Sequence, residues 1–193
     1  DKSVVIVTVG FLSNLADLLK SGPDKNSSLS GKDLVAQKVK KWVAMAGAFP
    51  EGSEFNVNQH PDASEYVVKN WPSPVLFSGF EIGVKIMTGS KVAVSGSKNS
   101  PVHWAYKYCL ETYDKKPIMT RNSWDHTAVL CPVRNPEDYF YVIKDGTFVC
   151  NPDGSDGWNP DKNSNHSFLV NKYPYQKIAA ILDDLMLYEP KGK

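Results

Sequence analysis

The sequence predicts an α/β protein with an open, mostly parallel sheet and flanking helices, followed by a small carboxyl-terminal β-hairpin and helix. Three apolar runs have the composition of strands that are buried on both faces: Ser3–Val9, Trp42–Met45 and Val75–Gly79. Helix-like stretches separate these runs. The resulting order of strand, helix, strand, helix, strand is typical of right-handed crossovers in a parallel sheet. The chain length and the lack of internal repeats predict that residues 1–193 form a single domain.

The stretches between and after these strands carry helical signals. The first helix is expected to begin at Ser13 or Asn14, either of which can cap it, and Leu15, Leu18 and Leu19 recur at helical spacing. Further helical or partly helical pieces are expected at Gly31–Lys40, Asp62–Trp71, Gly79–Thr88, Val102–Tyr113 and, capped by Ser123, Trp124–Leu130.

The chain changes in character after Pro132. The β-rich segments Tyr139–Ile143 and Thr147–Cys150 flank the dipeptide Asp145-Gly146, and this pattern predicts a β-hairpin with a tight turn. Two stretches are expected to be loops, Gly89–Ser100 and Asn151–His166. A short strand is expected at Ser167–Val170, followed by an amphipathic closing helix at Tyr175–Leu187.

The composition is that of an ordinary globular protein, with 41% apolar and 22% charged residues. The net charge of +1 and the interspersed charges give no electrostatic footprint for nucleic acid or for an anionic membrane. No apolar stretch reaches the roughly 18 residues that a membrane span needs. We therefore expect neither nucleic acid nor a membrane as a partner.

The three cysteines and the start of the chain bear on its context. Cys109, Cys131 and Cys150 are widely spaced, which favours reduced or partly buried thiols over one disulfide plus a free thiol. Asp1 is followed almost at once by an apolar run, and this leads us to expect that a further segment precedes it.

The first candidate site is the loop that follows the second strand. In this loop Glu54 and Asn56 alternate around Phe55. If the backbone is extended there, both polar side chains point one way. A carboxylate and a carboxamide side by side suit the vicinal hydroxyl groups of a sugar. The alternative is a structural role in which Glu54 and Asn56 cap the next helix.

The second candidate site is Ser123–Thr127. Asp125 suits either the first turn of a helix, where the macrodipole favours it, or a hard cation such as calcium. His126 is a candidate acid or base, although a lone histidine is more often structural. Trp124 and His103 are more typical of packing or of a pocket wall. The sequence contains no P-loop, no dinucleotide fingerprint and no serine nucleophile elbow.

Four short motifs together resemble a known family. Val9–Ala16 resembles the Thr-Gly-Pro-Leu-Thr-Asn-Ile-Ala segment of the inosine–uridine-preferring nucleoside hydrolases, and Met45–Gly47 is similar to their Met-Gly-Gly. Glu54–Asn56 followed by His60–Ala63 is similar to their Glu-Phe-Asn-Ile and Asp-Pro-Glu-Ala motifs. Trp124-Asp125 occupies the place of a His-Asp pair. The order and the spacing agree over about Val4–Val133.

The resemblance implies an α/β N-ribohydrolase, in which water attacks the anomeric carbon of a ribonucleoside and a bound calcium ion holds the water and the ribose diol. Carried over position by position, the main-chain carbonyl of Val9 and the carboxylate of Asp125 would be calcium ligands. Met45, Glu54 and Asn56 would contact the ribose. The implied partner is a small-molecule nucleoside or sugar.

The chain departs from the family pattern in ways that shape the hypothesis. The aspartate-rich amino-terminal motif, which supplies most calcium ligands in the family, has no counterpart here. We therefore expect the carboxyl-terminal part of a larger nucleoside hydrolase-like domain, completed by an amino-terminal segment or a companion chain. Trp124 replaces the family's histidine and is expected to hold the base by stacking. His126 or His103 would then have to act as the acid that protonates the leaving group.

Two other functions remain open from the sequence. One is a non-catalytic nucleoside- or sugar-binding relative that keeps Glu54 and Asn56 without the chemistry. The other is a structural subunit whose partner holds the site. For each of these hypotheses a homo-oligomer is the expected assembly.

Overall fold

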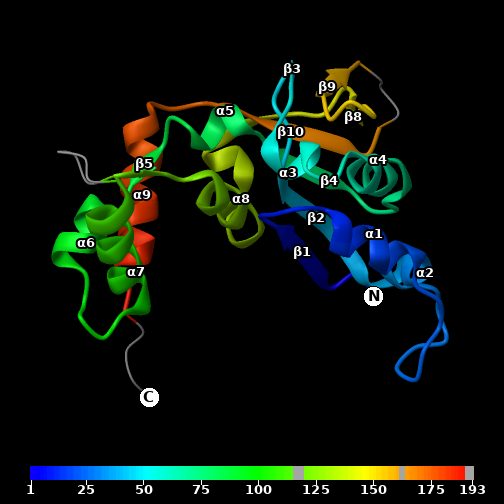
Figure 1. The fold of residues 1–193 in the computed structure, drawn as a ribbon, viewed down its shortest axis with the longest axis horizontal. Coiled ribbons are helices and arrows are strands. Elements are labelled where there is room, and N and C mark those ends of the chain that lie inside the picture. The colour runs from blue at the N-terminus through cyan, green and yellow to red at the C-terminus, as the bar shows by residue number, and fades with distance from the viewer. Residues whose placement is uncertain (115–119, 161–163, 190–193) are drawn as a thin grey trace.

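The computed structural model describes residues 1–114, 120–160 and 164–189, and its centre is a five-stranded sheet. The strand order is β1 (Val4–Thr8), β2 (Val39–Met45), β4 (Val75–Ser78), β10 (His166–Asn171) and β7 (Phe140–Ile143). The first four strands are parallel, and β7 is antiparallel at one edge (Figure 1). The predicted α/β fold with a mostly parallel sheet is confirmed.

Helices cover both faces of this sheet. On one face lie α1 (Ser13–Lys20), α2 (Gly31–Lys38) and α4 (Pro61–Asn70), and on the other lies α8 (Trp124–Val133) (Figure 1). The alternation of side chains along β2 explains this arrangement: Trp42 and Ala44 belong to one buried cluster, Val43 and Met45 to the other. A strand that is buried on both faces needs such an uninterrupted apolar run.

The centre of the first cluster is Trp42. Its ring lies 5.0 Å from that of Trp71 and 5.8 Å from that of Phe77, measured between centroids. The Trp42 indole Nε1 donates a hydrogen bond of 2.8 Å to the hydroxyl of Thr8, so the one polar atom of the ring is satisfied. This contact also ties the carboxyl end of β1 to β2.

The predicted pairing of Tyr139–Ile143 with Thr147–Cys150 is wrong. β7 pairs with β10 in the main sheet, whereas β8 (Thr147–Cys150) pairs with β9 (Asp156–Asn159). The short turn that we expected needs positive φ angles, and Gly146 does not have one. The small carboxyl-terminal hairpin is instead formed by β8 and β9, joined by a turn in which Gly154 has a φ of 83°.

Other differences lie in segments that looked like loops. Gly89–Ser100, expected to be a loop, contains the helix α6 (Ser90–Ser95). Asn151–His166, also expected to be a loop, contains the strand β9. Residues 161–163 of this second stretch lie outside the described residues. α1 begins at Ser13 with no side-chain cap. The remaining elements are β3 (Glu51–Gly52), α3 (Phe55–Asn58), α5 (Phe80–Gly83), β5 (Met87–Thr88), α7 (Pro101–Cys109), the π-helical turn η1 (Leu110–Asp114), β6 (Arg121–Asn122), the 3-10 turn η2 (Pro136–Asp138) and α9 (Tyr175–Met186).

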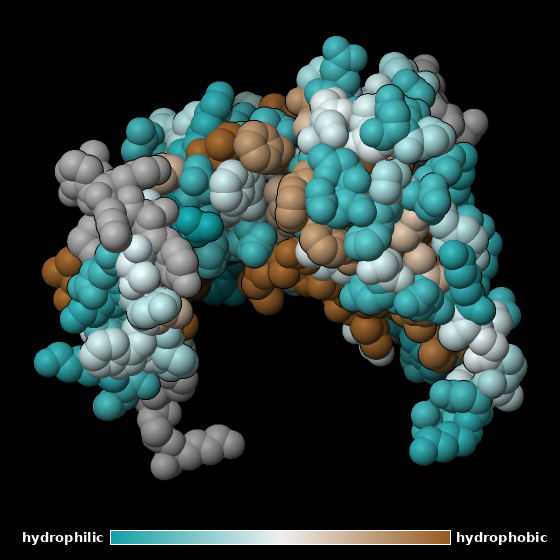
Figure 2. Space-filling model, viewed as in Figure 1, coloured by the Kyte–Doolittle hydropathy of each residue, from teal (hydrophilic) through white to brown (hydrophobic). Residues whose placement is uncertain are grey.

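A lobe of α6, α7 and α9 stands to one side of the sheet, beyond α8 (Figure 1). Figure 2 shows a hollow between this lobe and the sheet, with apolar side chains gathered along it near α8 and β1. Val4, Val9 and Val133 are among the exposed apolar residues of this region. No helix in the described ranges is both long and apolar enough to cross a membrane. All three cysteines are free thiols, as the favoured alternative predicted.

Gly47 fixes the direction in which the chain leaves β2, and this gives a test of the fold. Its φ is +85°, and a Cβ built at this position would lie 2.7 Å from the ring of Phe148. We expect Gly47→Ala to lower the free energy of unfolding in urea by at least about 1 kcal/mol, because a left-handed backbone and a steric overlap both oppose the methyl group.

The matched control is Gly22→Ala, because a Cβ at Gly22 meets nothing within 4 Å. We expect this control to change the free energy of unfolding by less than about 0.5 kcal/mol. Equal effects of the two substitutions would contradict the geometry given for Gly47.

Candidate functional site

A cavity of about 310 Å³ lies at the carboxyl edge of the parallel strands, and we call it the sheet-edge cavity. The strand ends are level there, since Thr8 pairs with Ala44 and Met45 pairs with Ser78. The residues that directly follow these ends therefore converge, as ligand-binding loops do in open α/β sheets. The cavity is lined by Val9, Met45, Glu54, Phe55, Asn56, Phe80, Trp124 and Asp125.

The structure thus brings together six residues that the sequence singled out from separate motifs: Val9, Met45, Glu54, Asn56, Trp124 and Asp125. Their roles as ribose contacts or calcium ligands remain predictions. The sequence did not point to Phe80. It lies at the first position of α5, directly after β4, where the same sheet-edge argument applies.

Glu54 has an extended backbone, with φ −86° and ψ 142°, but the extended segment that we expected ends there because α3 begins at Phe55. It is the N-cap of α3, and its Oε2 accepts hydrogen bonds from the main-chain N–H groups of Asn56 (2.9 Å) and Gly47 (3.3 Å). The capping role is therefore real, because the first N–H groups of a helix need an acceptor. Glu54 nevertheless also lines the cavity, although only 4% of the residue is exposed.

Burial raises the pKa of the Glu54 carboxyl to about 6, and the negative charge of Asp156 acts in the same direction. The N–H groups of Asn56 and Gly47 oppose this shift. At neutral pH the group is therefore still ionised, and it can accept hydrogen bonds from a ligand's hydroxyl groups.

Asn56 is anchored to the end of β2. Its side-chain Nδ2 donates to the main-chain oxygen of Met45 at 3.0 Å and lies 3.1 Å from the Met45 sulfur. The carboxamide is thus held in one orientation beside Glu54. A fixed pair of this kind presents acceptors and a dipole to a polar ligand without further loss of side-chain entropy.

The sequence did not point to Asp156, which fixes this loop. Its carboxylate accepts hydrogen bonds from the main-chain N–H groups of Ala48 (2.7 Å) and Glu54 (2.8 Å). The residue is 3% exposed, and burial raises the pKa of its carboxyl. Glu81 adds a third carboxylate, which accepts from the N–H of Phe49 at 3.2 Å. No local pattern marks Asp156, because it lies in an Asn-rich stretch about a hundred residues after the loop that it fixes.

Aromatic side chains surround the mouth of the sheet-edge cavity. The rings of Phe80 and Trp124 are stacked, with centroids 5.6 Å apart, and the Trp124 indole donates to the main-chain oxygen of Phe80 at 3.0 Å. Phe55 is 60% exposed and lies 5.6 Å from Phe11. Exposed, oriented rings of this kind can stack on a planar heterocycle.

Asp125 lies in the first turn of α8, and the residue as a whole is exposed. Partial burial raises the pKa of this group, and the nearby His126 opposes the shift. Asp125 and Val9 are the two positions implied as calcium ligands. The described ranges contain no cluster of three or more His, Cys, Asp or Glu side chains that could hold a metal ion. Since calcium takes six to eight oxygen ligands, this set does not by itself fit a calcium ion.

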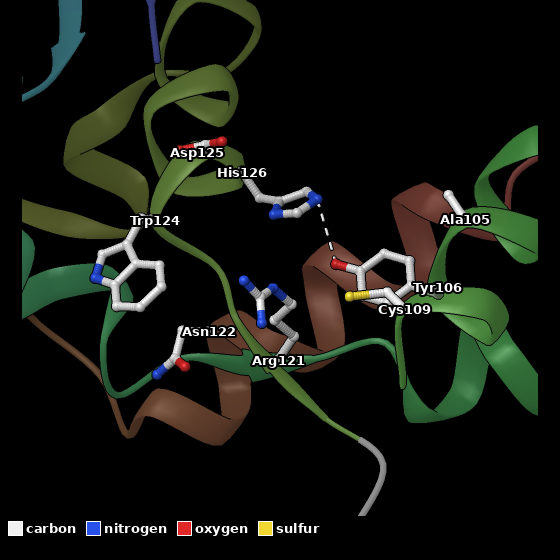
Figure 3. Close-up of a pocket in the computed structure, with 8 residues that line it drawn as sticks. All are labelled: Ala105, Tyr106, Cys109, Arg121, Asn122, Trp124, Asp125 and His126. Atoms are coloured by element: carbon white, nitrogen blue, oxygen red, sulfur yellow. Dashed lines mark hydrogen bonds between the residues drawn. The ribbon is translucent and has the colours of Figure 1, made fainter. Parts of the chain in front are cut away.

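His126 faces a different cavity, of about 260 Å³, which we call the lateral cavity. Figure 3 shows its ring turned toward Tyr106, and its Nε2 lies 3.3 Å from the Tyr106 hydroxyl. His126 does not line the sheet-edge cavity. His103 is buried in α7, where its Nδ1 lies 3.0 Å from the Val92 main-chain oxygen. Neither histidine lines the sheet-edge cavity, and the role of His126 as an acid remains a prediction.

Comparisons with known proteins support the fold. No family model matches the chain, and no curated protein matches its sequence. Among solved structures, the chain is similar to the type III effector protein XopQ, in its complex with adenosine diphosphate ribose, with 12% identity and a TM-score of 0.59. The match covers 96% of this chain and 61% of that chain, so this chain spans less than two thirds of the XopQ chain. The likeness supports the α/β fold.

The raised pKa of Glu54 predicts a pH dependence of stability. The folded-state pKa of about 6 exceeds the ordinary value of 4.5, so the folded protein holds this proton more tightly than the unfolded chain does. Acidification from about pH 7 to about pH 4 should therefore raise the free energy of unfolding of the wild type, relative to Glu54→Gln, by about 2 kcal/mol.

The comparison is made by urea unfolding at both pH values. Subtracting the values for the variant from those for the wild type removes the contribution of the other titrating groups. The control is Glu51→Gln, which makes the same substitution at an exposed carboxyl on β3. Parallel curves for the wild type and Glu54→Gln would show that the buried carboxyl is not perturbed.

Proposed function

We propose that the protein binds the ribose of a nucleoside-type ligand in the sheet-edge cavity. The observation that carries this proposal is the convergence of Glu54, Asn56 and Asp125 around one cavity with an aromatic mouth. The fold similarity to XopQ, a protein crystallised with adenosine diphosphate ribose, supports a ribose-containing ligand. The motif resemblance to nucleoside hydrolases supports the same class.

The geometry suggests how such a ligand would be held. The ionised Glu54 accepts hydrogen bonds from two ribose hydroxyl groups, and the fixed Asn56 amide completes the recognition of the diol. Charge-assisted hydrogen bonds are stronger than neutral ones, so the carboxylates dominate this contact. The base of the bound ligand projects out through the mouth of the cavity, where Phe55, Phe80 and Trp124 offer apolar faces.

The finer proposal is calcium-dependent hydrolysis of the N-glycosidic bond. Val9 and Asp125 would supply part of a calcium shell, and an amino-terminal segment or a companion chain would supply the remaining oxygen ligands. β1 offers a place for such a segment. It is an edge strand that pairs only with β2 among the described strands, and its side chains include the exposed Val4. An unpaired apolar edge readily accepts a further strand.

The alternative is a protein that binds a nucleoside or sugar without hydrolysing it. One observation favours this alternative for the chain by itself: among the described residues that line the sheet-edge cavity, none is a histidine. Trp124 stands at the place where the family has its histidine. Stacking by Trp124 would hold the base but would not protonate it.

Nucleoside binding is tested by isothermal titration calorimetry with inosine and uridine. We expect Asp125→Asn to weaken binding by about tenfold or more, because the loss of a charged hydrogen-bond partner costs roughly 1.5–3 kcal/mol. Asp184→Asn is the matched control, since Asp184 is an exposed aspartate that pairs with Lys91 in another part of the molecule. Absence of binding by the wild type, or equal affinities for Asp125→Asn and the wild type, would contradict the proposal.

Hydrolysis is tested separately by chromatography of the free base. Calcium-dependent release of base by the protein, together with the amino-terminal segment or companion chain, would support the hydrolase. Nucleoside binding that protects the protein against thermal unfolding, with no release of base under the same conditions, would select the non-catalytic alternative.

A further inference from the structure

Another cavity, of about 370 Å³, lies beside the carboxyl ends of β4 and β10, and we call it the Glu81 cavity. Its walls come from the loop after β2, from α5 and the residues after it, from the end of β10 and from the start of α9. It shares no described lining residue with the sheet-edge cavity, so it is a separate space. Six residues give this cavity its chemical character: Phe49, Glu81, Lys85, Phe168, Asn171 and Tyr175.

Within the described part of the chain, two residues of this cavity each have a buried oxygen atom without a hydrogen-bond partner, Glu81 Oε1 and Asn171 Oδ1. The other polar atom of each side chain is engaged. Glu81 Oε2 accepts from the N–H of Phe49 at 3.2 Å, and Asn171 Nδ2 donates to the main-chain oxygen of Tyr173 at 2.6 Å. Because a buried polar atom without a partner is unfavourable, two such acceptors at one cavity indicate that a hydrogen-bond donor occupies it.

The Glu81 carboxylate also lacks a positive neighbour. Burial raises the pKa of this carboxyl, and the negative charge of Asp156 acts in the same direction. The N–H groups of Glu81 itself and of Phe49 oppose the shift, and no described lysine or arginine is among the charges that act on the group. A positively charged donor would therefore suit this oxygen better than a neutral one.

A lysine and a pair of aromatic rings complete the cavity. Lys85 is exposed, and its ammonium group lies 5.4 Å from the centroid of the Tyr175 ring. It forms no ion pair with a carboxylate of the described residues, so it can bind an anionic group that enters the cavity. Phe49 and Phe168 are stacked with centroids 4.4 Å apart, and they provide apolar surface. The cavity thus combines acceptors, a cation and an apolar wall.

We propose that the Glu81 cavity binds an amino acid with an apolar side chain, such as leucine. The ammonium group of the ligand donates to Glu81 Oε1 and Asn171 Oδ1, after a small turn of the two side chains brings these oxygens to the ligand. The carboxylate of the ligand pairs with Lys85, and its apolar side chain packs against Phe49 and Phe168. Only a ligand with both charges uses all three polar groups, since a simple amine would meet Lys85 and a simple acid would meet Glu81.

The experiment compares L-leucine with two analogues by NMR chemical-shift titration of the full chain at neutral pH. L-leucinamide lacks the carboxylate, and 4-methylpentanoate lacks the ammonium group. We expect the wild type to bind leucine with a Kd of about 1 mM or lower. Each analogue should bind at least tenfold more weakly, because it loses one charged contact; a tenfold change corresponds to about 1.4 kcal/mol.

Two variants separate the two charged contacts. Glu81→Gln keeps an oxygen acceptor for the N–H of Phe49 but removes the negative charge. It should abolish the preference for leucine over 4-methylpentanoate and keep the preference over leucinamide. Lys85→Gln should have the converse effect. Glu51→Gln is the matched control, because Glu51 is exposed and is not among the described residues that line this cavity, and it should keep both preferences.

The inference is overturned if the wild type binds none of the three ligands at concentrations up to about 10 mM, as it would if ordered water or Lys85 itself satisfied Glu81. It is also overturned if leucine and its analogues bind equally, or if Glu81→Gln and Lys85→Gln weaken all three ligands alike. A uniform loss would mean that the substitutions disturb the loop and not one charged contact. Nucleoside binding is a separate result, because the two cavities share no described lining residue.

Discussion

The two hydrogen bonds that Asp156 accepts from the N–H groups of Ala48 and Glu54 are the constraint on which the site depends. They close the loop between β2 and α3, and Glu81 adds a third main-chain contact at Phe49. Burying carboxylates is unfavourable, and burial raises the pKa of all three acids here. Hydrogen bonds from the main chain offset part of this cost. The result is a rigid loop that holds Glu54 and Asn56 at the sheet edge.

The parallel sheet brings the residues of the sheet-edge cavity together. Because β1, β2 and β4 end at the same level, residues from distant motifs meet there without any special folding of the loops between them. Glu54 shows that capping a helix and lining a cavity need not exclude each other. The same carboxylate caps α3 and lines the cavity, and the N–H groups of Asn56 and Gly47 hold it in one orientation there.

The sequence predicted the parts of this structure that depend on local patterns. The apolar runs of β1, β2 and β4 identified the sheet, and the short motifs singled out six of the residues that line the cavity. Long-range pairing could not be predicted in this way. β7 joins β10 rather than β8, and Asp156 reaches its partners across about a hundred residues. The alternation expected around Phe55 fails because a helix, capped by Glu54, begins at that residue. Arg121 reaches the lateral cavity from β6, which pairs with β5, and both strands are too short to recognise from the sequence.

A crystal structure of the protein with bound adenosine would test the central claim most directly. The account predicts ribose hydroxyl groups within hydrogen-bond distance, about 2.5–3.2 Å, of the carboxylates of Glu54 and Asp125, with the base against Phe80 and Trp124. A nucleoside bound elsewhere on the molecule, or one whose ribose turns away from Glu54, would contradict it.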